Sequence, residues 1–120
     1  MTEKSRTQSP IFVKTYDFLL WLLPLTIKFP KSQRFLLAEK IGKLALEFYD
    51  VILEAAVTRP VSMDFIPQAD LLLNKLRLYL RLSYDLHCIS ISQYEFASKS
   101  MDEIGRLLGG WKAKISKHLV

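Results

Sequence analysis

The chain has 120 residues, of which half are hydrophobic, and a formal net charge of +5. This length allows one domain, and the hydrophobic content is sufficient for a single buried core. The basic excess is modest, so it permits a nucleic acid or an acidic protein as partner without deciding between them. Cys88 is the only cysteine, which excludes an intrachain disulfide and fits a reducing compartment, so we expect a cytoplasmic protein.

Residues 1–9 are polar and predict a flexible tail, because they contain neither the apolar segment nor the cleavage site of a secretory signal. Residues 10–120 are predicted to form one helical domain. Its first helix is expected to begin at Pro10, after Ser9 as N-cap, and to run to about Lys28.

Two prolines and one apolar run characterise this first helix. Pro24 is expected to kink or loosen it, because proline lacks an N–H and its ring crowds the preceding turn, and Pro30 is expected to stop it. The apolar run Phe18–Ile27 has about half of the roughly 20 residues needed to cross a bilayer. We therefore predict a buried helix without membrane contact, and the alternative is a helix that lies in the membrane surface.

The second helix is predicted over Gln33–Ala56, with Ser32 as its N-cap. Its apolar residues recur every three or four positions, at Leu37, Ile41, Leu44, Ala45, Phe48 and Ile52. The segment Thr58–Met63, which contains Pro60, is the longest predicted loop.

The third helix, predicted over Pro67–Tyr84, has more apolar surface than a single bundle buries. On a helical wheel, the expected core side consists of Leu72, Leu73, Leu76 and Leu80. A second apolar zone consists of Leu71, Leu78, Tyr79 and Leu82. Because such a patch often marks an interface, we predict a homo-oligomer with this zone and part of the first helix at the subunit contact. The alternative is that Lys and Arg stems or the N-terminal tail cover these leucines.

The fourth helix is predicted to begin with a capping box of Ser92 and Glu95, to carry a hydrophobic staple of Ile91 and Phe96, and to end near Lys117. The sequence has no segment with the alternating pattern of a strand. Four helices joined by short loops predict an all-α, antiparallel, up-down-up-down four-helix bundle.

Three glycines lie inside this fourth helix, at Gly105, Gly109 and Gly110. They follow no strand, so they do not form a phosphate-binding loop. Their helical spacing predicts the close approach of another helix, with Trp111 packing beside that contact.

Three clusters of basic residues contain few acids. The first surrounds the connection after the first helix, at Lys28, Lys31, Arg34, Lys40 and Lys43. The other two lie in the third helix and at the end of the chain, at Lys75, Arg77 and Arg81 and at Arg106, Lys112, Lys114 and Lys117. The alternative for each cluster is a solvated helix face, and the last cluster is expected near the acidic residues Glu47, Asp50 and Glu54.

Arg77 and Arg81 are four residues apart, so both guanidinium groups are expected to project from one stripe of the third helix. Arginine binds phosphate and carboxylate in a bidentate manner and also stacks on flat groups. This pair therefore suits either an RNA backbone or a protein partner.

The sequence predicts no catalytic, cofactor-binding or metal-binding residues. His87 adjoins Cys88, but neighbours in sequence at a helix end do not form a nucleophile–base pair, and no metal-ligand spacing is present. We therefore predict a protein that binds other molecules and catalyses no reaction.

Several segments resemble a known family. The third helix reads Leu76-Arg77-Leu78-Tyr79-Leu80-Arg81-Leu82, and the fourth reads Gly105-Arg106-Leu107-Leu108-Gly109-Gly110-Trp111. The first helix and its end contain Tyr16, Leu23-Pro24-Leu25 and Pro30-Lys31. Together these segments resemble the accessory variability determinant (Avd) proteins of diversity-generating retroelements, within the broader four-helix-bundle family of 23S ribosomal RNA intervening-sequence proteins.

The resemblance implies a barrel-like homopentamer with a basic surface that binds nucleic acid, RNA or DNA, and the reverse transcriptase of the retroelement. It implies support of mutagenic cDNA synthesis, and polymerase contact at Arg77 and Arg81. With these two, the candidate contacts for polymerase and nucleic acid are Lys28, Lys31, Arg34 and Arg106, which are expected to bind with little sequence specificity. The alternative function is a structural or protein-interaction bundle with no nucleic-acid role, like the intervening-sequence proteins.

Overall fold

The structure, a computed structural model, describes residues 9–119, so the predicted tail lies outside the described residues except for Ser9. Every regular element in this part of the chain is helical, which confirms the all-α prediction. The elements are α2 (Pro10–Ile27), α3 (Lys31–Gln33), the π-helical segment η1 (Arg34–Ala38), α4 (Glu39–Val57), α5 (Phe65–Asp85) and α6 (Ile91–Leu119).

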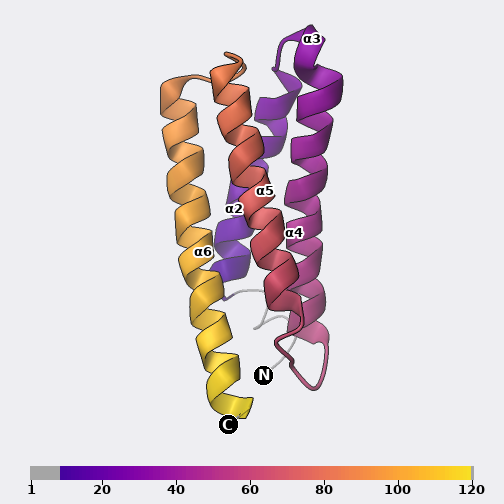
Figure 1. Ribbon diagram of the computed structural model, residues 1–120, viewed down its shortest axis with the longest axis vertical. Helices are drawn as coiled ribbons and strands as arrows, with labels where there is room; N and C mark the ends of the chain where they lie inside the picture. Colours follow the sequence, from indigo (N-terminus) through magenta and orange to yellow (C-terminus); the bar gives the residue numbers. More distant parts are fainter. Residues whose placement is uncertain (1–8, 120) are drawn as a thin grey trace.

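The four long helices lie side by side along one axis, in a molecule that measures 49 × 23 × 21 Å (Figure 1). Helix α2 packs against α4 and α6, and α5 packs against the same two helices, so α2 and α5 lie on opposite sides of the bundle. In Figure 1, α5 is in front and α2 is behind it, and the connections between successive long helices lie at alternating ends.

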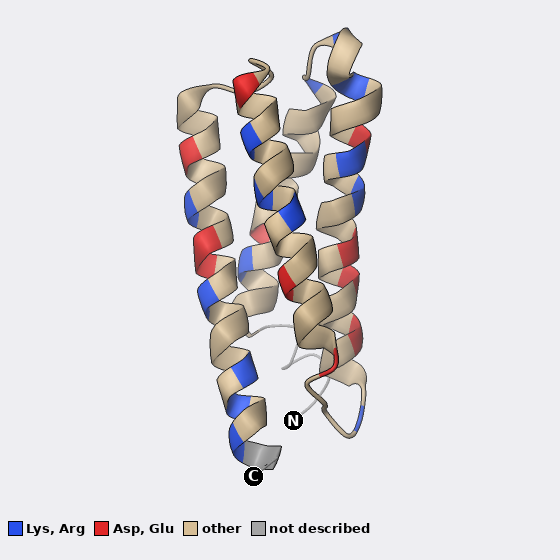
Figure 2. Cartoon of the chain, viewed as in Figure 1, with Lys and Arg blue, Asp and Glu red and all other residues tan. Residues whose placement is uncertain are grey.

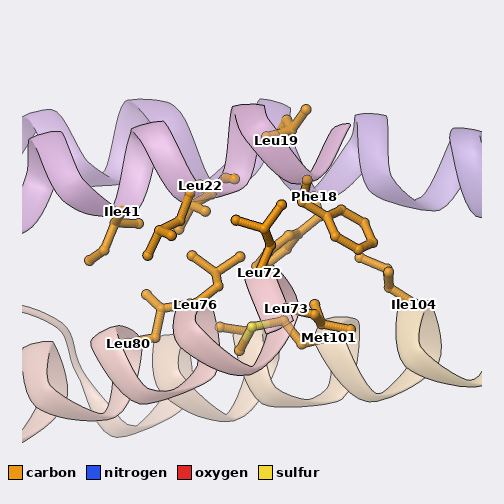
Figure 3. Packing of buried hydrophobic residues seen from close by; sticks show 14 of the residues in the cluster. Phe18, Leu19, Leu22, Ile41, Leu72, Leu73, Leu76, Leu80, Met101 and Ile104 are labelled. Carbon is orange, nitrogen blue, oxygen red and sulfur yellow. The ribbon is translucent and has the colours of Figure 1, made fainter. Parts of the chain in front are cut away.

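One hydrophobic core fills the space between the four helices, and its side chains come from all of them (Figure 3). The predicted core side of α5 is buried, since Leu72, Leu73, Leu76 and Leu80 are each at most 6% exposed. They meet Leu22 of α2, Ile41 of α4 and Met101 of α6 inside the same cluster. Burial of each leucine contributes about 1.5–3 kcal/mol to folding, so this core holds the helices together.

Helix α2 continues through Pro24 and ends at Ile27, close to the predicted end. The Thr26 hydroxyl donates to the carbonyl oxygen of Leu23 at 2.8 Å, which satisfies one acceptor near the proline. By length and composition alone, α2 is the one described helix that qualifies as a candidate membrane span. Its inner face is part of the bundle core, as the predicted buried helix requires.

The second helical body begins earlier than predicted, at Lys31, with Pro30 at the N-cap position. Ser32 is therefore not the N-cap, and its hydroxyl instead donates to Gln33 Oε1 at 2.6 Å. The segment η1 then forms a π-helical turn before α4 begins, and the wider turn changes which side chains face the core. Phe35 and Leu36, which lie in this turn, are each 77% exposed.

Helix α5 ends in a Schellman motif. The Cys88 N–H donates to the Ser83 carbonyl at 2.8 Å, and the His87 N–H donates to the Tyr84 carbonyl at 2.9 Å. His87 has a φ of 63°, the left-handed conformation that this motif requires after the helix. The chain therefore reverses direction within a few residues and aligns α6 against α5.

The fourth helix begins with a capping box, but the box lies two residues earlier than predicted. The Ser90 N–H donates to Gln93 Oε1 at 2.8 Å, and the Gln93 N–H donates to Ser90 Oγ at 3.1 Å. Ser92 and Glu95 are not the box, and Ile91 is exposed at the first helical position. Both pairs fit the same sequence pattern, and the sharp turn after α5 selects the earlier one.

Candidate subunit and nucleic-acid interfaces

Three leucines form an apolar stripe on the outer side of α5. Leu71, Leu78 and Leu82 are 54%, 71% and 42% exposed, and we call them the α5 stripe. Tyr79, which the sequence grouped with them, is half-buried against the core, and the Lys40 ammonium lies 5.9 Å from the centre of its ring. Tyr79 therefore contributes less to the outer surface than the three leucines.

A second exposed apolar stripe lies on α2. It consists of Val13, Tyr16, Leu20 and Ile27, each between 48% and 68% exposed, and we call it the α2 stripe. Because α2 and α5 are on opposite sides of the bundle, the two stripes face away from each other. The sequence predicted only part of the first helix at a subunit contact. The spacing of these four residues by three, four and seven positions is that of one helix face and indicates the whole stripe.

Arg77 joins α5 to α6. Its Nη1 atom lies 2.8 Å from Asp102 Oδ1, and its Nη2 atom donates to the Met101 carbonyl oxygen at 3.2 Å. A Cβ on Gly105 would lie 2.9 Å from Arg77 Nη2, so the absence of a side chain at Gly105 makes room for the guanidinium group. The side chain is about one third exposed, and most of its donors face α6.

Arg81 is in a different environment from Arg77. Its side chain is 61% exposed, and its Nε atom lies 3.2 Å from Asp85 Oδ2, one turn later on the same helix. The hydrogen bond to Asp85 raises the pKa of Arg81, so the group is charged at any physiological pH. The two arginines share one helix, but Arg81 is more exposed to solvent and pairs within its own helix, whereas Arg77 bonds to α6.

We predict that Arg77→Ala lowers the free energy of unfolding by about 1–2 kcal/mol, because it removes a charged hydrogen-bond donor that bridges two helices. Arg81→Ala is expected to leave the melting temperature unchanged, since its ion pair with Asp85 is solvent-exposed. Thermal unfolding followed by circular dichroism measures both. Equal loss of stability in the two variants would contradict the assignment of Arg77 as a bridge between helices.

Three of the candidate basic residues lie at the end of the bundle where α2 meets α3 (Figure 2). Lys28, Lys31 and Arg34 are exposed, and Arg34 Nη2 donates weakly to the Phe29 carbonyl oxygen at 3.5 Å. The exposed Phe35 and Leu36 of η1 follow them directly. This combination of cations and apolar side chains was missed in the sequence, where Phe35-Leu36-Leu37-Ala38 had no polar residue to indicate an outer face.

Lys112, Lys114 and Lys117 are exposed on the last turns of α6, toward the other end of the bundle, and Arg106 is exposed nearly two turns before them. The acidic residues Glu47, Asp50 and Glu54 belong to α4, which lies diagonally across from α6. The ion pairs found among the described residues are Lys14–Glu103, Arg77–Asp102 and Arg81–Asp85, and none of them joins the two groups. The acids of α4 therefore form no ion pair with this cluster.

The close approach predicted at the glycines of α6 occurs at only one of them. A Cβ on Gly105 would contact Arg77 and Leu73, whereas one on Gly109 or Gly110 would have no described residue from another helix within 4 Å. Trp111 packs as predicted, with its ring centre 4.6 Å from Phe65 and 5.7 Å from Phe12. The packing prediction was therefore wrong for Gly109 and Gly110 within one protomer.

The described residues contain no group of three or more His, Cys, Asp or Glu side chains arranged to hold a metal ion. Cys88 is half-buried, and desolvation by burial raises the pKa of its thiol. A raised pKa lowers the fraction of reactive thiolate at neutral pH.

The family model described as bAvd-like matches residues 11–115 of this chain. No curated protein matches the chain. The matched region begins in the first turn of α2 and ends near the end of α6, so it includes both apolar stripes and all six candidate basic residues.

Proposed function

Because this chain belongs to the bAvd-like family, as its sequence resemblance predicts, we propose that it is a non-enzymatic accessory subunit of a diversity-generating retroelement. In this role it binds the reverse transcriptase of the element together with template RNA or cDNA, and supports mutagenic reverse transcription in the cytoplasm. The observation that carries the proposal is the family match over nearly the whole bundle.

The distribution of charge supports nucleic-acid binding. Lys28, Lys31 and Arg34 at one end of the bundle are exposed, as is Arg106 near the middle of α6. None of these four has an ion-pair partner among the described residues. Lysine and arginine that contact phosphates supply affinity and orientation without reading the bases. Binding is therefore weakly sequence-specific and depends on the number of phosphates contacted.

The two apolar stripes support assembly of up-down-up-down protomers into a ring. Contact between the α2 stripe of one copy and the α5 stripe of the next uses two different surfaces, and such contacts form closed rings when the rotation between copies closes. Each contact covers leucines that are exposed in the protomer. A pentamer, as the family resemblance implies, repeats the few cations of each protomer five times around one particle.

Co-purification with a candidate reverse transcriptase of a diversity-generating retroelement, followed by nucleic-acid binding at several salt concentrations, tests this function. We expect the polymerase to co-purify, and the logarithm of the affinity to fall linearly with the logarithm of salt, with a slope near −0.9 per phosphate contacted in duplex. Replacing Lys28, Lys31 and Arg34 with Gln should make that slope shallower.

Lys99→Gln is the matched control, because Lys99 is exposed but lies one turn from Glu95 and from Glu103. It should leave the salt dependence unchanged. Absence of binding at low salt, or binding that salt does not weaken, would contradict the nucleic-acid role and leave a structural bundle like the intervening-sequence proteins.

A further inference from the structure

A groove of about 420 Å³ opens at the end of the bundle where α2 begins and α4 ends. Its wall is mostly apolar and includes Phe12 of α2, Ala55 of α4, and Leu107 and Trp111 of α6. The volume is in the range of sites that bind small molecules, which are also mainly apolar with a few polar groups at the edge. The groove is therefore large enough for a flat ring such as a nucleobase.

The charged residues that line this groove all have the same sign. They are Arg59, Arg106 and Lys114, and no acid is among the described residues that line it. The Arg59 guanidinium group already makes hydrogen bonds within the protein, since its Nη1 atom donates to the carbonyl oxygens of Ala56 and Thr58 at 3.3 and 2.9 Å. Arg106 and Lys114 have no ion-pair partner among the described residues, so they remain able to bind an anion.

Gly110 of α6 also lines the groove, and packing inside the protomer does not require a glycine there. Apart from its chain neighbours and the adjacent backbone of α6, a Cβ on Gly110 would meet no described residue within 4 Å, unlike one on Gly105, which would meet Arg77. Glycine is the least favourable residue after proline inside a helix. Since packing does not require glycine at position 110, its presence there needs a different explanation. The absence of a side chain at Gly110 keeps the groove open beside Trp111.

The basic residues of α6 continue beyond the groove. Arg106 lies four residues before Gly110 and Lys114 four residues after it, on the same side of the helix, and Lys117 lies three residues beyond Lys114. A polymer with one negative charge per unit matches such a row, whereas a small anion uses only the groove itself. An aromatic and apolar wall next to cations is the usual arrangement for single-stranded nucleic acid.

We propose that this groove is a subsite for one unpaired base of single-stranded nucleic acid, with the adjoining phosphates bound by Arg106 and Lys114. The proposal rests on the nucleic-acid role proposed above and extends it, because a groove of this kind distinguishes single strands from duplex. Duplex bases are stacked and paired, so duplex contacts only the cations of α6.

The test compares Gly110→Leu with Gly109→Leu. Both replace an exposed helical glycine whose Cβ would meet no described residue of another helix within 4 Å, but of the two only Gly110 lines the groove. Fluorescence anisotropy measures binding of each variant to a short uridylate-rich RNA strand and to a blunt duplex of equal length at one low salt concentration. We expect Gly110→Leu to weaken single-strand binding about tenfold relative to Gly109→Leu, and to leave duplex binding equal in the two variants.

Equal single-strand affinities in the two variants would overturn the base subsite, while the nucleic-acid role would stand. A change in oligomer mass in Gly110→Leu alone would also overturn it, and would assign the groove to a neighbouring subunit. Competition by a short acidic peptide with an aromatic residue, but not by uridine monophosphate, would assign the groove to a protein segment instead. Failure of the unsubstituted protein to bind either nucleic acid would remove the proposed function itself.

Discussion

Replacement of both Leu78 and Leu82 with Glu is expected to separate the assembly into protomers of 13.9 kDa. Covering a fully exposed leucine at a subunit contact contributes about 1.5–3 kcal/mol, and these two leucines contribute in proportion to their exposed fractions. A carboxylate brought into the same apolar contact is unfavourable because it loses its hydration. Since Leu78 is 71% and Leu82 is 42% exposed in the protomer, the fold of the bundle should be unaffected.

Light scattering after size-exclusion chromatography measures the mass, and circular dichroism checks that the helices remain. Ile91→Glu is the matched control, because Ile91 is 52% exposed but lies at the start of α6, outside both stripes. It should leave the mass unchanged. A doubly substituted protein that keeps the mass of the unsubstituted assembly would exclude the α5 stripe from the contact, and a monomeric unsubstituted protein would remove the ring altogether.

Dissociation should also weaken nucleic-acid binding, although no cation is changed. A ring that presents the same cations several times gains affinity through effective concentration, which commonly amounts to a factor of about 100 or more. We therefore expect the Leu78→Glu, Leu82→Glu protein to bind a long RNA at least about 100-fold more weakly than the assembly. Equal affinity would mean that one protomer supplies the entire nucleic-acid surface.

The core was predictable because it depends on periodicity, which the sequence contains directly. Leu72, Leu73, Leu76 and Leu80 recur at helical spacing and are all buried. The exposure of Leu78 was predictable for the same reason, because one helix in a bundle buries one face. Neither conclusion required knowledge of which helices are neighbours.

The details that the sequence did not predict depend on contacts between elements. The π-helical turn at Arg34–Ala38 has no sequence signal of its own, and it exposes Phe35 and Leu36. Arg77 and Arg81 look equivalent on a helical wheel, but the space left by Gly105 of α6 lies beside Arg77 and not beside Arg81. Spacing alone gives the direction of a side chain, whereas its partner depends on the helix that packs beside it.

One experiment can distinguish the contributions of the core face and of the outer stripe of α5 to stability, because Leu78 and Leu80 are two residues apart on the same helix. Leu80 is 0% exposed, so Leu80→Ala should lower the free energy of unfolding of the protomer by about 2–5 kcal/mol. Leu78→Ala should leave it within about 0.5 kcal/mol, because the exposed side chain loses little contact.

Urea denaturation measures both values, and the choice of background decides what they mean. The effect of Leu80→Ala on the protomer is measured in the dissociated Leu78→Glu, Leu82→Glu protein. The effect of Leu78→Ala on the protomer is measured in the Leu82→Glu protein, provided that the mass of this protein is that of a protomer. In the assembled protein, Leu78→Ala should lower stability, because folding and association are then linked. A loss of stability from Leu78→Ala in the protomer itself would mean that the leucine packs inside its own bundle. The surplus apolar surface on which the assembly depends would then not exist.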